Sequence, residues 1–299
     1  MRLISVPILM VLAACGSTDT AGGGADAASP ADAGPDTAKG SPDVLIGAFQ
    51  VNLVAPNATA TGFTSVFGKV SDGPNPATIL WTVAKKEGVC TLLTPKVPFC
   101  ATPCGGSAVC DADDHCQPYP SAQTVGTVHA TGIRLPSGVA AFALVPLGKI
   151  YQPSGGVTLP YPAFGEGDAI VLSAQGSAWN GAFALHATGI APLQGVAVGA
   201  VVLEHGKDLT LNWTAAKDSQ ASTLHVKLDV SHHGGAKGVL ACDAPDSGSL
   251  TVSASLVAGL LDLGTAGYPT IVLSRRAVGS VVIGAGRVDL NVLSSVERE

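Results

Sequence analysis

Alternation of apolar and polar residues is the dominant pattern of this chain after residue 43. The clearest case is residues 45–54, in which Phe49, Val51 and Leu53 fall on one face. Residues 222–231 repeat the pattern with a face made of Leu224, Val226, Leu228 and Val230. A period of two predicts β-strands with one buried face and one solvated face.

Similar runs recur along the chain and are separated by Gly, Pro, Asn and Asp, which favour turns. They predict strands at 45–54, 62–70, 78–85, 124–132, 139–146, 168–174, 181–190, 195–203, 208–214, 222–231, 237–242, 248–254, 269–274 and 280–296. One short helix is expected at 255–263, ended by Gly264. The pattern predicts an all-β fold, an antiparallel β-sandwich built as one domain or as two packed Ig-like subdomains.

Two smaller features bear on packing. Trp81 and Trp213 lie in apolar strands, and we expect both in the core. The sequence His-Ala-Thr-Gly-Ile at 129–133 recurs at 186–190, each time downstream of a Pro-Tyr-Pro. This echo has two interpretations: two related strand–turn units packed side by side, or chance convergence in a chain rich in Ala, Gly and Thr.

Composition supports a chain of short strands and tight turns, because 37 residues are glycine and only 13% are charged. The net charge is −6, and Lys and Arg are scattered, with no basic cluster beyond Arg275-Arg276. This distribution argues against a nucleic-acid partner, which requires a concentrated positive surface.

The amino terminus has the layout of a secretory signal, with one positive charge, an apolar run too short to span a bilayer, and small residues before a cysteine. Leu12-Ala13-Ala14-Cys15 resembles the lipobox of bacterial lipoproteins. The resemblance implies a signal peptide at 1–14 and a lipid-bearing Cys15 that anchors the chain in a membrane. It also implies the outer membrane, because no Asp follows the cysteine. The alternative is an ordinary secretory signal with a stray cysteine.

Residues 15–42 read as a lipidated, disordered tether, because they contain no aromatic residue and no Leu, Ile or Val. Beyond the tether we expect a β domain at 43–205, with a cysteine-rich insertion at 90–120. An Ig-like portion follows at 206–299, separate from the first domain or continuous with it.

Seven cysteines are present, and setting Cys15 aside leaves six that an exported protein would pair. Five lie within 90–116, so one of them must join Cys242 if all are oxidised. Several pairings remain open. We rank first the set Cys90–Cys242, Cys100–Cys110 and Cys104–Cys116, whose first bond would close a very long loop.

No motif of catalysis, metal binding or cofactor binding is complete, so we assign no catalytic residue, no metal ligand and no cofactor. Neither a G-x-S-x-G elbow nor an H-E-x-x-H motif occurs. The acidic run Asp111, Asp113 and Asp114 departs from the EF-hand pattern and reads as a solvated turn. Adjacent His232 and His233 would point to opposite faces of a strand, which disfavours a shared metal.

Two stretches carry a family resemblance: Cys90 to Pro120, with its PFCATPCGGSAVC run, and residues 211–263. Together they resemble uncharacterised β-rich lipoproteins of the myxobacterial type. The second stretch is also similar to Ig-like or fibronectin-like repeats of exported bacterial proteins. The resemblance implies fold and location, and it brings no catalytic residues.

These features favour a non-enzymatic envelope lipoprotein that acts as a structural or binding module for an envelope protein or a glycan. Two other hypotheses stay open. One is a hydrolase of envelope polymers, which would need a pocket joining Ser or Asp with His186 or His232. The other is a metal-responsive binder that uses the acidic run or the histidines.

Overall fold

The computed structural model describes residues 42–298 except 112, 198–201, 234 and 236. The expected signal peptide, Cys15 and all of the tether but Pro42 lie outside the described residues. The described residues belong to one compact unit. Among them, no helix has both the length and the apolar character that a membrane crossing requires.

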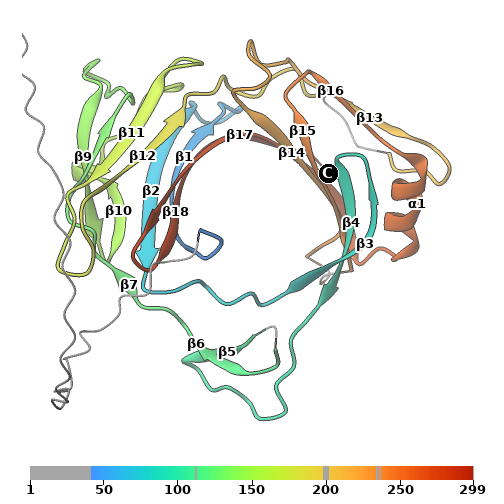
Figure 1. Ribbon diagram of the computed structural model, residues 1–299. Helices are drawn as coiled ribbons and strands as arrows, with labels where there is room; N and C mark the ends of the chain where they lie inside the picture. Colours follow the sequence, from blue (N-terminus) through green and yellow to red (C-terminus); the bar gives the residue numbers. More distant parts are fainter. Residues whose placement is uncertain (1–41, 112, 198–201, 234, 236, 299) are drawn as a thin grey trace, which may run out of the picture. The chain divides into compact units, whose positions relative to one another are not determined.

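The described chain is made of strands with one short α-helix, which confirms the all-β class (Figure 1). The strands are β1 (Leu45–Val54), β2 (Phe63–Ser71), β3 (Leu80–Glu87), β4 (Cys90–Lys96), β5 (Ala108–Cys110), β6 (Cys116–Pro118), β7 (Ala122–Gln123), β8 (Val128–Thr131), β9 (Ala141–Leu147), β10 (Ile150–Pro153), β11 (Ala169–Ala174), β12 (Phe183–Thr188), β13 (Leu209–Asn212), β14 (Thr223–His233), β15 (Val239–Pro245), β16 (Ser249–Val252), β17 (Gly267–Ile283) and β18 (Gly286–Arg298). The helix α1 spans Ala254–Asp262, and a 3₁₀ turn η1 spans Ser154–Gly156.

Most strands join one large sheet in the order β12-β11-β8-β9-β10-β2-β1-β18-β17-β14-β15-β4-β3, with β7 paired to β2. Two small sheets, β13–β16 and β5–β6, complete the described strands. Every described pairing is antiparallel except β1 with β18, which is parallel. A parallel pair needs a long connection, and here the strands come from opposite ends of the described chain (Figure 1). Strands from both sides of residue 205 therefore share one sheet.

The long β17–β18 hairpin connects two hydrophobic cores that lie on the same face of its strands. The first core packs Ala277, Val288 and Leu290 of the hairpin with residues of β1, β2 and β8 to β12. The second packs Ile271 and Leu273 with strands β4, β14 and β15 and with β13, β16 and α1. Around the first core the large sheet folds back on itself, because its edge strand β12 contacts β17 and β18. A small sheet and a helix cover the second core, so both cores are layered as in a sandwich-like fold.

Between the two cores the buried positions of the hairpin are polar. Arg275 donates from Nε to Asp246 Oδ2 at 2.5 Å, and the two side chains are 1% and 0% exposed. Asp246 also accepts from Trp213 Nε1 and Ser222 Oγ, each at 2.7 Å. Burial alone would raise the pKa of Asp246, but the Arg275 guanidinium and these hydrogen bonds hold it below its usual range.

The same arginine fixes the strand connection that crosses between the cores. Its Nη atoms donate to the backbone oxygens of Ala191, Pro192 and Thr214 at 3.3, 3.2 and 2.6 Å. Ser294, opposite Arg275 on β18, accepts from the backbone N–H of Leu193 at 2.9 Å. Both residues therefore tie the segment after β12 to the hairpin.

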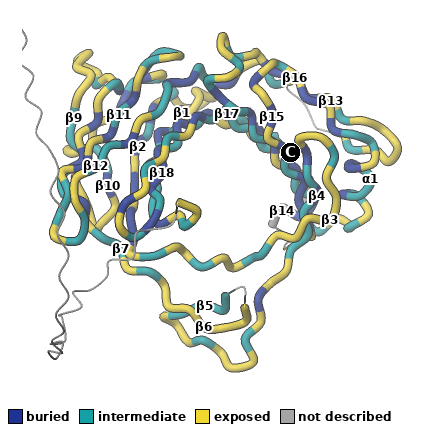
Figure 2. The backbone as a smooth tube through the Cα atoms, viewed as in Figure 1, coloured by how far each residue is buried: buried dark blue, intermediate teal, exposed yellow. Residues whose placement is uncertain are grey.

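Most predicted strands are confirmed, and β1 has the bounds expected from the sequence. The predicted inward faces of β1 and β14 are buried, as Figure 2 shows along these strands. The helix lies one residue earlier than expected, and its N-cap is Ser253, whose Oγ accepts from the N–H of Leu256.

Three expectations about the strands and their packing are wrong. Residues 195–197 and 202–203 are not strand, because Val196 and Leu203 pack against the second core without strand partners, while 198–201 lie outside the described residues. The predicted break before residue 280 is absent, since β17 continues to Ile283. Trp81 is 41% exposed because β3 is the edge of the sheet, whereas Trp213 is 6% exposed and in the core.

The echoed sequence, for which two interpretations were open, places His129 on β8 and His186 on β12. These two strands flank β11 and do not pair with each other.

Candidate binding groove

The outward-facing residues of β2 form a mixed aromatic and polar row. Along this strand Thr64, Val66, Gly68 and Val70 are buried, which leaves the alternate positions outside. We call these positions the β2 outer row: Phe63, Ser65, Phe67 and Lys69. Phe63 is 38% exposed and Phe67 is 39% exposed, so two aromatic side chains present large parts of their surface to solvent.

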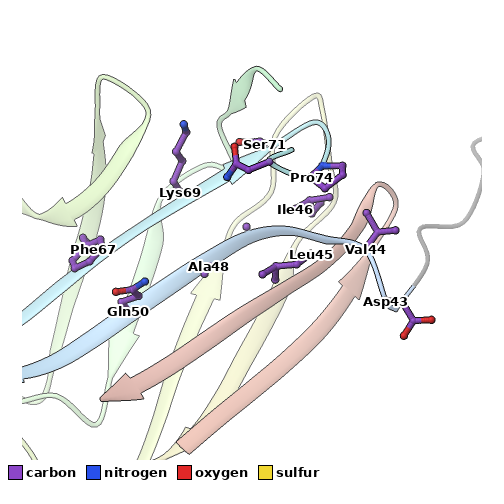
Figure 3. Close-up of a pocket in the computed structure, with 12 residues that line it drawn as sticks. Asp43, Val44, Leu45, Ile46, Ala48, Gln50, Phe67, Lys69, Ser71 and Pro74 are labelled. Atoms are coloured by element: carbon purple, nitrogen blue, oxygen red, sulfur yellow. The ribbon is translucent and has the colours of Figure 1, made fainter. Parts of the chain in front are cut away.

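A groove of about 560 Å³ lies on one side of Phe67, between β1, β2 and the loop after β2 (Figure 3). Its walls are formed by the following residues: Asp43, Val44, Leu45, Ile46, Gly47, Ala48, Gln50, Phe67, Lys69, Ser71, Pro74 and Asn75. In Figure 3 Gln50 lies on the neighbouring strand β1, and the ammonium end of Lys69 extends away from β2. The groove thus combines an apolar wall with a few polar groups, as ligand sites commonly do.

A second groove of about 650 Å³ lies on the other side of Phe67 and includes Phe63 and Ser65. Its far wall is formed by residues 145–147 and 152–158. Because Phe67 lines both grooves, they adjoin each other along β2. Phe63 and Phe67 are four residues apart in a strand, a separation of about 13 Å.

The base beneath this row is tightly packed. Gly68 lies against the ring of Phe49, and a Cβ at this position would be 2.2 Å from a ring carbon. The rings of Phe49 and Tyr151 have centroids 5.6 Å apart. Tyr151 Oη accepts from the N–H of Val125 at 2.7 Å and donates to the oxygen of Gly126 at 2.9 Å. Burial raises the pKa of Tyr151, which keeps the donating proton in place. A rigid base of this kind holds surface side chains in fixed positions.

Amide side chains continue the polar surface onto β1 and β18. Gln50 is in register with Phe67 on one side and with Asn291 on the other, and Asn52 is in register with Ser65. All three amides are partly exposed. None of their side-chain amide groups has a hydrogen bond to another residue in the described part of the chain. Their donors and acceptors are therefore available to a ligand.

The six cysteines form three disulfides: Cys90–Cys242, Cys100–Cys110 and Cys104–Cys116. This is the set that we ranked first from the sequence. Cys90 and Cys242 are direct cross-strand partners on β4 and β15. The sulfur atoms of Cys100, Cys104 and Cys116 lie within 4.8 Å of one another. Since each belongs to a disulfide, they are not the thiolates that bind zinc.

The acidic run after β5 forms hydrogen bonds that shape its own turn. Asp111 Oδ1 accepts from the N–H groups of His115 at 2.9 Å and Asp113 at 3.0 Å. These bonds, led by the one from His115, lower the pKa of Asp111. Asp114 Oδ1 accepts from the N–H of Phe99 at 3.0 Å. Among the described residues, these carboxylates do not form a group close enough to hold a metal ion.

The candidate histidines lie on strands other than β2. His186 is an exposed residue of β12 and lines neither groove. His232 and His233 end β14, where the backbone pairs with β17. His225 is 2.8 Å from Asp243, which also pairs with Arg276 on the exposed side of β14, β15 and β17.

Sequence reasoning missed the β2 outer row. The segment 62–70 was predicted as a strand, but both of its faces contain apolar residues, Phe63 and Phe67 on one and Val66 and Val70 on the other. The glycine at position 68, within a strand that has Phe at 63 and 67, was the available signal in the sequence. A glycine inside a strand indicates that another group approaches its backbone closely, and here that group is the ring of Phe49.

No protein-family model matches the sequence, and no curated protein matches it either.

Proposed function

We propose that this chain is a non-enzymatic lipoprotein of the cell envelope that binds a glycan in the grooves along β2. The signal layout and the lipobox-like sequence support a lipid anchor at Cys15, and the absence of Asp after it supports the outer membrane. The polar, alanine- and glycine-rich tether would let the domain reach beyond the headgroups.

The observation that carries the proposal is the pair of exposed rings, Phe63 and Phe67, beside unsatisfied amide groups on a rigid sheet. A sugar ring has an apolar C–H face, which stacks on aromatic rings, and a rim of hydroxyls, which bond to amides. Both grooves are open, and they share Phe67. An extended saccharide chain fits this arrangement better than a compact ligand, which would require an enclosed pocket.

The proposal is tested by co-sedimentation of the full-length protein, kept in detergent, with insoluble polysaccharide prepared from the envelope. Phe67→Ala is expected to lower the bound fraction strongly, and Phe63→Ala to lower it less, because Phe67 lines both grooves.

The matched control is Phe99→Ala, which removes a 78% exposed aromatic ring in the cysteine-rich loop. It should leave retention unchanged. Equal retention of the wild type and both β2 variants would contradict the proposal, and loss with Phe99→Ala alone would place the ligand on the cysteine-rich loop.

A further inference from the structure

We infer that the grooves along β2 bind an acidic saccharide, whose carboxylate or phosphate group pairs with the ammonium of Lys69. This inference rests on the proposed function and names the ligand class. It follows from the position of one unpaired cation at the end of the aromatic row.

Lys69 is an exposed residue of β2 that has no ion pair or hydrogen bond with any described residue. Other cations near the groove are already engaged. Arg287 donates from Nε to Asp289 Oδ1 at 2.9 Å, and Asp289 also accepts from Ser280 at 2.7 Å. Asp43, the one acidic residue among the described residues that line the groove, lies at the end away from Lys69 (Figure 3).

The spacing of Lys69 and Phe67 suits a charged sugar. They are alternate residues on the same face of a strand, so their Cα atoms are separated by about 7 Å. A sugar ring on Phe67 would place a carboxylate or phosphate substituent within reach of the flexible lysine side chain. Asn75, which lines the same groove, can bond to hydroxyls of the next sugar unit.

Charge and position together favour an acidic ligand at this site. The chain has a net charge of −6, so a polyanion is repelled by the molecule as a whole and is attracted where an unpaired cation lies beside an aromatic groove wall. Recognition of an acidic chain should therefore depend on this lysine and should weaken as salt screens the pair.

The test is a calorimetric titration of the full-length protein in detergent with three probes. The first is an oligogalacturonate, the second is its neutral methyl ester with the same backbone, and the third is a phosphorylated oligomannose. The wild type should bind the better of the two acidic probes about three- to tenfold more tightly than the ester. Lys69→Gln should abolish that preference while it leaves binding of the ester unchanged. The two acidic probes distinguish a carboxylate from a phosphate ligand.

The control is Lys86→Gln on the exposed edge strand β3, which should keep the preference. If acid and ester bind equally and Lys69→Gln has no effect, the inference is overturned while the proposed glycan-binding function stands. If no saccharide binds, the proposed function fails as well.

Discussion

Arg275 and Asp246 show how a single buried pair organises the centre of this molecule. The pair lies between two hydrophobic cores, and its hydrogen bonds extend to Trp213, Ser222 and the connection after β12. Every buried side-chain nitrogen and oxygen in the described residues has a hydrogen-bond partner. A polar group placed here is therefore tolerated because it is fully satisfied.

Removing the arginine should be costly. Arg275→Met leaves the Asp246 carboxylate buried without its cation, and we expect a loss of about 3–5 kcal/mol in the free energy of unfolding. Urea denaturation at pH 7 measures it. Arg276→Met, next to it but on the exposed side, should cost less than about 1 kcal/mol. Similar losses for the two variants would show that the buried pair has no special role.

The helix α1 depends on contacts made by the β3–β4 hairpin. Glu87 at the end of β3 accepts hydrogen bonds from Ser253 at 2.5 Å and Ser255 at 2.7 Å, and it pairs with Lys85 at 3.0 Å. The bond from Ser253 is the largest of the effects that lower the pKa of Glu87 from 4.5 to about 2. A carboxylate at a helix N-terminus is also favoured by the helix dipole.

This lowered pKa predicts a pH dependence with a defined sign. The ionised Glu87 stabilises the fold above pH 4.5, and its contribution is lost as the pH falls through about 2. Glu87→Gln should therefore have a lower urea midpoint than the wild type at pH 7, and the difference should shrink towards pH 2. Glu297→Gln, exposed on β18, should show no such trend. A difference that does not change with pH would contradict the assignment.

The elements that could be predicted from the sequence are the strands that bury one face and expose the other. The strands β1 and β14 alternate over their predicted lengths, so the inward faces of both and the bounds of β1 follow from the pattern. The pairing of Cys242 with the early cysteine cluster follows from parity. Alternation is a local property of the sequence, and the parity argument needs only the number of cysteines.

The rest depends on tertiary contacts that no local pattern contains. The pattern predicted a gap between strands at 275–279, but Gly279 lies inside β17. A Cβ there would lie 1.7 Å from the oxygen of His186, so the glycine serves the close approach of β12. Trp81 is exposed because β3 is an edge strand. The groove forms where β1, β2 and the loop after β2 meet in space. The partly exposed amides beside it, Gln50 and Asn52 on β1 and Asn291 on β18, lie far apart in the sequence.

At the scale of the whole molecule, the proposed protein consists of a membrane anchor, a tether and a domain with an open binding surface. The anchor prediction is tested by Cys15→Ser, which removes the atom that would be acylated. The variant should move from the membrane fraction to the soluble fraction and should keep its signal segment, because cleavage follows lipid attachment. Membrane retention of the variant at the wild-type level would contradict the anchor.

An NMR titration of the isotope-labelled protein in detergent micelles measures whether a saccharide binds along β2. With the tightest-binding saccharide, we predict shift changes in the backbone signals of residues 63–69. The side-chain amide signals of Gln50, Asn52 and Asn291 should change as well, while residues 97–119 should not respond. Saturating ligand that leaves 63–69 unchanged, or that shifts only the cysteine-rich loop, would contradict the account.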